Sequence, residues 1–305
     1  EVYESLAQGE YNKNYVFNHP KLNKKLVLRI NFGSQMHLER QIEYEFNALK
    51  LLEDSKRTPK PIYVDGSLEE LDHGIMVMEF LEGEHLDYKK DLKKASSCLA
   101  DIHSIVLPKE NTLLTPKNPV DAVLYECEEM FSVYENNESA DKSKKDKIRK
   151  MLERVKRSSK SESTLSCHSC CINTELNSSN FLVNKEKAFL VDWEKPIIGE
   201  AAQDLAHFLA PTTSFWKTDI ILSRKEQDDF ISDYIQFVGD RFDTSHIRER
   251  TGYYIPLNCM RGITWCAMAW IQYKNAYKGL RNEFTAKKLE AYLSDEFLEL
   301  VDKRI

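Results

Sequence analysis

The stretch that decides the fold is NFLVNKEKAFLVDWE, which spans residues 180 to 194. Two short β-prone runs, 181–183 and 188–191, flank a polar segment, and this pattern predicts a β-hairpin. The outer ends of an antiparallel hairpin lie together, so we expect Asn180 and Asp192 to face one site. Amide and carboxylate oxygens are hard ligands that suit Mg²⁺ carrying nucleotide phosphates. The alternative is an ordinary surface hairpin with polar ends.

The composition is that of a globular protein. The chain has 305 residues, of which 42% are hydrophobic and 30% are charged, and it is long enough to bury a substantial core. A formal net charge of −6 argues against nucleic acid or an anionic membrane surface as the main partner. No apolar run reaches the length of a membrane span, and no targeting signal opens the chain.

The cysteines favour a cytoplasmic protein. There are 7 of them, and an odd count in a chain of this size favours reduced thiols over a disulfide framework. The segment Cys167-His168-Ser169-Cys170-Cys171 could suggest zinc, but a structural zinc site needs four suitably spaced ligands and no second pair follows. We expect this segment to be a strand that leads into a loop at Asn173.

The first eighty residues predict a small sheet with one helix. The helix is expected over 38–52, with an apolar face that includes Ile42 and Leu49. Glu45 borders this face and needs a cation, and Arg29 on a neighbouring strand is the candidate partner. The alternative is two unrelated surface charges. The expected strands cover residues 15–17, 26–31, 62–64 and 75–80.

The chain after Glu82-Gly83 is predicted to be mainly helical apart from the hairpin. This division predicts an α+β fold of two lobes. Residues 1–82 would form a nucleotide-binding N-lobe that ends in a linker, and residues 83–305 a helical C-lobe with the metal hairpin. A nucleotide would lie between the lobes. The expected helices cover residues 92–106, 120–134, 144–155, 203–209, 224–238, 261–277 and 286–301.

Several motifs together resemble the aminoglycoside phosphotransferase and choline kinase-like family, which shares the protein-kinase fold. The resemblance runs from about Leu6 to Tyr273 and is densest from Glu175 to Leu209. The segments that carry it are Gly9-Glu10-Tyr11-Asn12, Val27-Leu28-Arg29, Met78-Glu79-Phe80-Leu81-Glu82-Gly83, Leu99-Ala100-Asp101-Ile102-His103, Asp192-Trp193-Glu194 and Asp204-Leu205-Ala206.

The resemblance implies a role for each matched residue. Gly9 and Asn12 would belong to the hairpin over the phosphates, although this loop has a single glycine. Arg29 would touch the phosphates and pair with Glu45. Backbone groups of Met78, Glu79, Phe80 and Leu81 would receive the adenine edge. Asn180 and Asp192 would hold Mg²⁺, and Asp204 would brace the catalytic loop.

The chain departs from the family at the chemical centre. The family pattern is His-x-Asp-x-x-x-x-Asn, and its Asp accepts the proton of the substrate hydroxyl. Five residues before Asn180 stands Glu175, and two before that stands Asn173. Glu175 carries the same carboxylate one methylene further out. Because a displacement of about 1 Å can cost on the order of a hundredfold in rate, Glu175 keeps the chemistry possible without guaranteeing it.

The leading hypothesis is a small-molecule kinase that uses ATP or GTP with Mg²⁺, with Glu175, Asn180 and Asp192 as catalytic residues. The alternative is a nucleotide-binding pseudoenzyme that regulates a partner. A protein kinase is disfavoured because Asp192 and Asp204 are too close in sequence for a long activation loop. An amine-bearing sugar or amino alcohol is one substrate class, which an acidic face or a tryptophan-lined pocket would favour. The candidates for these features are Glu126, Glu128, Glu129, Asp204, Asp228, Trp216, Trp265 and Trp270. The alternatives are a solvated acidic helix face and tryptophans that belong to the core.

Overall fold

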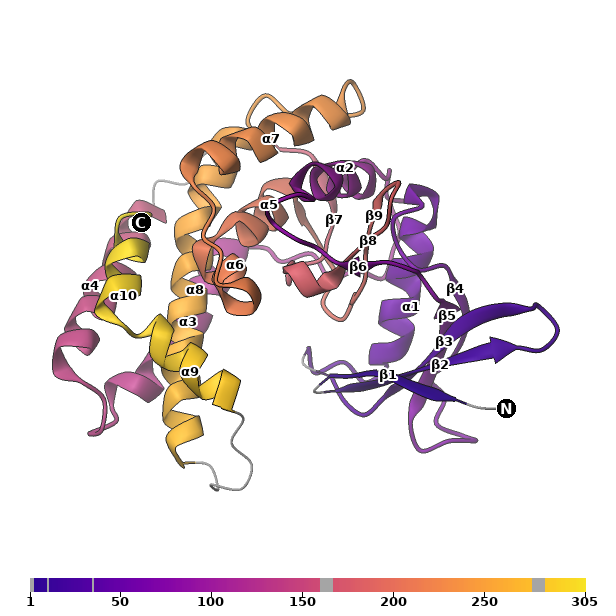
Figure 1. Ribbon diagram of the computed structural model, residues 1–305, viewed down its shortest axis with the longest axis horizontal. Helices are drawn as coiled ribbons and strands as arrows, with labels where there is room; N and C mark the ends of the chain where they lie inside the picture. Colours follow the sequence, from indigo (N-terminus) through magenta and orange to yellow (C-terminus); the bar gives the residue numbers. More distant parts are fainter. Residues whose placement is uncertain (1–2, 10, 35, 160–166, 276–282) are drawn as a thin grey trace. The chain divides into compact units, whose positions relative to one another are not determined.

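The computed structural model describes residues 3–9, 11–34, 36–159, 167–275 and 283–305 (Figure 1). The chain groups into two compact units. Unit 1 comprises Glu1–Thr115, His168–Ala201 and Asp228–Thr244, and unit 2 comprises Pro116–Cys167, Ala202–Gln227 and Ser245–Ile305. The mixture of a small antiparallel sheet with a larger set of helices confirms the predicted α+β fold class. The functional division at residues 82 and 83 stays a prediction.

Unit 1 begins with a five-stranded antiparallel sheet in the order β1-β2-β3-β5-β4. The strands predicted from sequence fall on β2 to β5, and the fourth ends one residue earlier than predicted. In the register of the sheet, Arg29 on β3 lies opposite Asn14 on β2 and Met76 on β5. Arg29 is therefore on a central strand. The strands are β1 (Glu4–Gln8), β2 (Asn12–His19), β3 (Lys24–Asn31), β4 (Pro61–Asp65) and β5 (Gly74–Glu79).

Helix α1 (Gln41–Leu52) packs against β4 and β5 and continues into the short 3₁₀ turn η1 (Glu53–Ser55). It buries Ile42 and Leu49, as the periodicity predicted, and also Glu45, which was expected only to border that face. The helix begins three residues later than expected. Arg40, which directly precedes the helix, has a non-helical backbone with φ of −121° and ψ of 58°, so the helical conformation begins only at Gln41.

The second part of unit 1 contains the predicted hairpin. Strands β8 (Phe181–Val183) and β9 (Ala188–Leu190) pair antiparallel, and β6 (Glu84–His85) extends the sheet on the β8 side. The Val191 amide donates to the Asn180 carbonyl oxygen at 2.8 Å, so the two hairpin ends meet as predicted. Gly83 precedes β6, and a Cβ there would lie 2.9 Å from the Val183 nitrogen. This close approach of two backbones explains the glycine.

The hairpin is joined to the rest of unit 1 by Arg57. Its carbonyl oxygen accepts from the Leu190 amide at 2.8 Å, and its guanidinium binds the Asp101 carboxylate and the Ala188 carbonyl oxygen. Asp101 belongs to α2 (Leu92–His103), which ends three residues before the predicted end. A two-stranded sheet of β7 (Ser169–Ile172) and β10 (Ile197–Glu200) flanks the loop that contains Glu175. Strand β7 confirms the expected strand before Asn173.

Unit 2 is helical. Its helices are α3 (Pro119–Glu135), α4 (Lys142–Ser159), α5 (Ala201–Leu209), α6 (Pro211–Thr218), the first turn of α7 (Arg224–Val238), α8 (Ile247–Asn275), α9 (Glu283–Tyr292) and α10 (Asp295–Asp302). Helix α8 packs against α3, α4, α6 and α9. None of the described helices is long and apolar enough to span a membrane.

Helix α4 extends from Lys142 to Ser159 rather than over 144–155, and three larger differences from the prediction occur in unit 2. Helix α8 begins at Ile247 rather than at residue 261 and contains Pro256, because its packing outweighs the local penalty of proline. The expected end of this helix at residue 277 lies outside the described residues. The single helix predicted over 286–301 is two helices, since Ser294 caps α10 by accepting from the Phe297 amide. Helix α6 was not predicted.

Gly262 on α8 should be required for the packing of α6. A Cβ at this position would lie 2.5 Å from the Thr212 Cβ, whereas a Cβ at Gly252 on the same helix would meet nothing within 4 Å. We expect Gly262→Ala to lower the free energy of unfolding by about 1–3 kcal/mol through overpacking. Gly252→Ala should raise it by up to about 1 kcal/mol through helix propensity. Urea unfolding of both variants tests this, and equal effects would contradict it.

Candidate functional site

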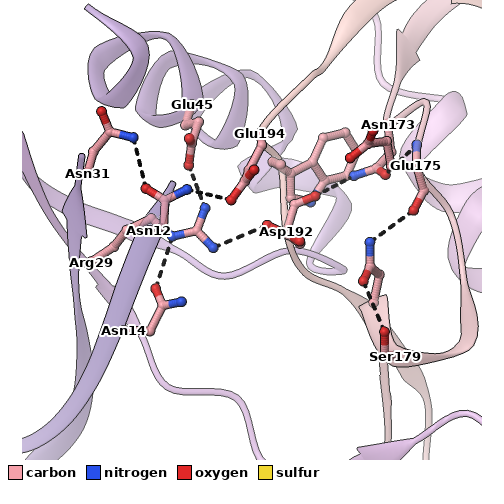
Figure 2. A network of polar contacts seen from close by, with 12 residues as sticks. Asn12, Asn14, Arg29, Asn31, Glu45, Asn173, Glu175, Ser179, Asp192 and Glu194 are labelled. Carbon is pink, nitrogen blue, oxygen red and sulfur yellow. Dashed lines mark hydrogen bonds and ion pairs between the residues drawn. The ribbon is translucent and has the colours of Figure 1, made fainter. Parts of the chain in front are cut away.

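The site lies in unit 1 and is built around the loop that leads into β8. Asn180, at the end of the 3₁₀ turn η2 (Ser178–Asn180), donates from Nδ2 to the Glu175 carbonyl oxygen at 3.0 Å. The Glu175 amide in turn donates to Asn173 Oδ1 at 3.2 Å. The side chains of Asn173 and Asn180 therefore fix the loop that carries Glu175 from both ends. Figure 2 shows this loop beside the Asp192 segment.

Asn173 also ties this loop to Asp192. Its Nδ2 donates to the Asp192 carbonyl oxygen at 2.8 Å, and the Asn173 side chain is buried. Asp192 has a left-handed backbone with φ of 65°, which costs energy in a residue that has a Cβ. Trp193, which is buried, donates from its indole nitrogen to the Leu190 carbonyl oxygen at 3.1 Å. Asn173, which stands where the family has His, thus supplies a donor that holds the backbone of Asp192.

Arg29 joins β2, α1 and the Asp192 segment. Its two terminal nitrogens contact Glu45 Oε2 at 2.6 Å and Asp192 Oδ1 at 3.3 Å, and its Nε donates to Asn14 Oδ1 at 3.0 Å (Figure 2). The predicted ion pair of Arg29 with Glu45 is confirmed. Only 7% of the Arg29 side chain and 1% of the Glu45 side chain are exposed. Lysine carries a single ammonium without a planar fork, so it could not make the three contacts in this geometry.

Burial and charge oppose each other at this pair. Burial works against the charged guanidinium, but the carboxylates of Glu45, Asp192 and Glu194 outweigh it and raise the pKa of Arg29. Burial raises the pKa of Glu45, and Arg29 and Gln41 oppose that rise. One guanidinium thus faces three acidic side chains. This excess of negative charge favours a cation near Asp192, whose side chain is 41% exposed.

Glu194 connects the first hairpin to this charge cluster. Asn12 Nδ2 donates to Glu194 Oε1, and Asn31 Nδ2 donates to Asn12 Oδ1 at 2.9 Å. The Gly9 amide donates to the Asn12 carbonyl oxygen at 2.9 Å and closes the turn between β1 and β2. Gln41 on α1 donates to the Glu194 carbonyl oxygen at 2.7 Å. The structure therefore brings Asn12 and Gly9 to the same cluster as Arg29 and Asp192.

The predicted adenine-binding residues lie at the end of the first sheet. Met78 is buried in β5, and Glu79 is exposed and ends the strand. The Glu79 amide donates to the Lys60 carbonyl oxygen at 2.9 Å. Phe80 and Leu81 follow outside the strand. Their role toward a nucleotide stays a prediction.

Sequence reasoning missed Lys195, which directly follows the Asp192-Trp193-Glu194 triplet. Its Nζ lies 2.6 Å from Glu175 Oε1. It also missed Gln41 and the functional connection of Glu194 to Asn12. The signal for Gln41 was available, because a polar residue stands one turn before Glu45 on the same face of the helix. No sequence signal pointed to Lys195.

The acidic and aromatic residues considered for substrate binding mostly have structural partners within unit 2. Glu126 pairs with Arg261 at 2.8 Å, and Glu128 pairs with Lys156. Asp204 is fully buried, so it does not contribute to an acidic surface. Trp216 and Trp265 contact each other edge to face with centroids 5.3 Å apart, and Trp270 packs against Tyr134.

The cysteine-rich segment is not the site of a metal cluster in the described part of the chain. Within those residues, no three His, Cys, Asp or Glu side chains gather in a way that could hold a metal ion. Cys170 and Cys171 are buried in β7, and His168 stacks on Phe242 with ring centroids 4.0 Å apart. The segment contributes to packing, as small apolar residues do.

Comparison with known families decides what kind of protein carries this site. The model of the phosphotransferase enzyme family matches residues 2–248. The chain belongs to this family. The match confirms the resemblance identified from the sequence and the expected enzyme class, a small-molecule kinase. A sequence search against curated proteins found no match for this phosphotransferase.

Solved structures share the fold at low sequence identity. A spectinomycin phosphotransferase in complex with ADP and spectinomycin has a TM-score of 0.66 and 15% identity, covering 100% of this chain and 93% of that chain. An ethanolamine kinase from Plasmodium vivax has a TM-score of 0.64 and 17% identity, covering 98% and 83%. An amicoumacin kinase with AMP-PNP, Ca²⁺ and Ami has a TM-score of 0.62 and 10% identity, covering 99% and 88%.

The protonation of Glu194 should make stability depend on pH. Burial, reinforced by the Asp192 charge, raises the pKa of Glu194 from 4.5 to about 7. Between these values the folded state keeps a proton that the unfolded state has released, so this group stabilises the fold less as pH rises. We expect the free energy of unfolding of the wild type to fall relative to Glu194→Gln between pH 5 and pH 8, measured by urea unfolding. The exposed Glu186 in the hairpin turn provides the control variant Glu186→Gln, and parallel curves for wild type and Glu194→Gln would contradict the prediction.

Proposed function

We propose that this phosphotransferase moves the γ-phosphoryl group of ATP or GTP to a hydroxyl group of a small molecule, with Glu175 accepting the hydroxyl proton. The observation that carries the proposal is the contact between the segment that precedes the hairpin of β8 and β9 and the segment that follows it. Asn173 binds the Asp192 carbonyl oxygen at 2.8 Å, and Asn180 binds the Glu175 carbonyl oxygen at 3.0 Å. Phosphoryl transfer depends mainly on such alignment and on charge stabilisation.

The donor set at the hairpin ends fits Mg²⁺. The Asn180 amide nitrogen donates to the Glu175 carbonyl oxygen. Oδ1, which accepts a long hydrogen bond from Ser179 Oγ at 3.5 Å, is the atom suited to a cation. Asp192 supplies a carboxylate that is 41% exposed. One amide oxygen and one carboxylate are a typical protein contribution to Mg²⁺, which keeps waters and phosphate oxygens as its other ligands. When bound by Asn180 and Asp192, Mg²⁺ would offset the negative charge of the phosphates.

The remaining residues have roles toward the nucleotide in this proposal. Arg29 would steady the phosphates while Glu45 and Asn14 hold its guanidinium in place. The turn at Gly9 and Asn12 would lie over the phosphates. Backbone groups of Met78, Glu79, Phe80 and Leu81 would bind the adenine edge. The ADP and AMP-PNP in the spectinomycin and amicoumacin enzymes support a nucleotide co-substrate.

The acceptor that we propose is an amine-bearing sugar or amino alcohol. The support is the fold shared with spectinomycin phosphotransferase and ethanolamine kinase. A protein acceptor is disfavoured because the chain passes from Asp192 through the short strand β10 directly into α5. This connection leaves no room for a long peptide-binding loop.

One observation favours a second candidate, a nucleotide-binding regulatory protein without transfer activity. The Glu175 carboxylate is longer than the family's Asp and already contacts Lys195 at 2.6 Å. A screen for ADP or GDP formation separates the two functions. It would use Mg²⁺ with ATP or GTP and offer ethanolamine, choline, spectinomycin, kanamycin and simple sugars as acceptors. Product formation with any acceptor supports the transferase, and nucleotide binding without product supports the regulator.

Removal of the Asp192 charge should weaken nucleotide binding only when Mg²⁺ is present. We expect Asp192→Asn to lower the affinity for ATP·Mg²⁺ by roughly tenfold or more, the scale found when a metal site loses a supporting carboxylate. The affinity for ATP in EDTA should change much less. Isothermal titration calorimetry with and without Mg²⁺ measures both. An equal loss under the two conditions would contradict a metal-binding role for Asp192.

Loss of the Glu175 charge should abolish transfer and spare binding. We expect Glu175→Gln to keep ATP·Mg²⁺ affinity and to lower transfer by roughly 10²-fold or more, as general base and positioning effects allow. Glu175→Asp should also impair transfer if the loop backbone is set for the longer side chain. Product formation in the acceptor screen measures both, with Glu186→Gln as the control. Transfer that Glu175→Gln leaves unchanged would show that Glu175 is not the base.

A further inference from the structure

The phosphoryl transfer proposed above assigns no role to the contact between Lys195 and Glu175. Lys195 Nζ lies 2.6 Å from Glu175 Oε1, with 14% of the lysine side chain and 36% of the glutamate side chain exposed. We infer that Lys195 is a positioning residue for phosphoryl transfer, which holds the Glu175 carboxylate where the acceptor hydroxyl must meet it. This inference rests on the proposed function, because it requires that Glu175 accept the proton.

The backbones on the two sides of this ion pair are already joined. Thr174 Oγ1 donates to the Lys195 carbonyl oxygen at 3.0 Å. Strands β7 and β10 then pair Ile172 with Ile197. Asn173 reaches the Asp192 carbonyl oxygen on the other side of Lys195. The backbone of Lys195 is thereby held beside Thr174, the residue that precedes Glu175. The position of this backbone limits where the ammonium group can lie.

Because the Glu175 side chain is longer than that of aspartate, its carboxylate needs a partner to fix its position. Glutamate has one more rotatable bond than aspartate, so its carboxylate can occupy more rotamers around the same backbone. Thr174 has a left-handed backbone with φ of 71°, which directs the chain into Glu175 but does not fix the end of the side chain. An ammonium ion at 2.6 Å selects the rotamers in which the carboxylate turns toward β10.

The ion pair does not exhaust the capacity of the carboxylate. An ionised carboxylate has two oxygens and about four lone-pair sites. Lys195 contacts Oε1, and a substrate hydroxyl can be accepted by the same group in addition. Lys195 can thus hold the Glu175 carboxylate while that carboxylate accepts a proton. Without the ammonium group the carboxylate would be able to move, and a displacement of about 1 Å can lower the rate on the order of a hundredfold.

A double-mutant cycle tests this inference with the acceptor of highest turnover in the screen. We expect Lys195→Met to lower kcat by roughly 10- to 100-fold with the KM for ATP unchanged, because positioning acts on the reacting group. Lys195→Arg, which keeps the charge, should restore most of kcat. In the Glu175→Gln background, Lys195→Met should have no further effect, since the residue it positions is already inactive. Lys185→Met, an exposed lysine in the hairpin turn, is the matched control.

Several results would overturn the inference. One is a kcat for Lys195→Met equal to that of the wild type. A second is an additive loss in the Glu175→Gln background. A third is a fall in unfolding midpoint that accounts for the lost activity, which would make the pair structural only. These results leave the proposed function standing if the wild type transfers phosphate. A wild type that transfers to no acceptor overturns the proposed function, and the inference falls with it.

Discussion

The backbone of Asp192 is the constraint on which the candidate site depends. Its left-handed conformation, with φ of 65°, turns the chain sharply after β9, at a cost of about 1–3 kcal/mol for a residue with a Cβ. Surrounding contacts must offset that cost. Asn173 binds the Asp192 carbonyl oxygen, Arg29 binds its carboxylate, and the buried indole of Trp193 binds the Leu190 carbonyl oxygen. These same contacts tie the Asp192 segment to the Glu175 loop through Asn173 and to β3 through Arg29.

Charge is the second organising feature. Arg29 is buried among Glu45, Asp192 and Glu194, and a guanidinium with three acidic neighbours cannot neutralise all of them. Part of the excess is relieved by the raised pKa of Glu194, about 7. The remaining negative charge lies on the Asp192 carboxylate, whose side chain is 41% exposed. The Arg29 guanidinium holds the Glu45 and Asp192 carboxylates close to each other.

The two substitutions at the chemical centre have different physical consequences. Asn173, in place of His, donates from a buried amide to the Asp192 carbonyl oxygen, so it joins the loop to the segment that follows the hairpin. Glu175 in place of Asp extends the carboxylate, and Lys195 meets it. Each of the two substituted side chains thus contacts the segment that follows the hairpin.

Much of the fold could be predicted from the sequence because it is local. The hairpin of β8 and β9 follows from two β-prone runs around a polar turn, and α1, α2 and α7 follow from apolar residues at helical spacing. The pair of Arg29 and Glu45 was accessible because a half-buried carboxylate needs a cation. Where packing overrides local preference the prediction failed, as at Pro256 inside α8 and at the break before Ser294.

The sequence by itself indicated the family, the hairpin and a set of candidate site residues that did not include Lys195. Only the tertiary structure decided which of those residues meet. Arg29 contacts Asp192 across 163 positions of the chain, and Asn12 contacts Glu194 across 182. Lys195 reaches Glu175 only because β7 pairs with β10. Such contacts depend on how separate elements pack, and periodicity or spacing describes one element at a time.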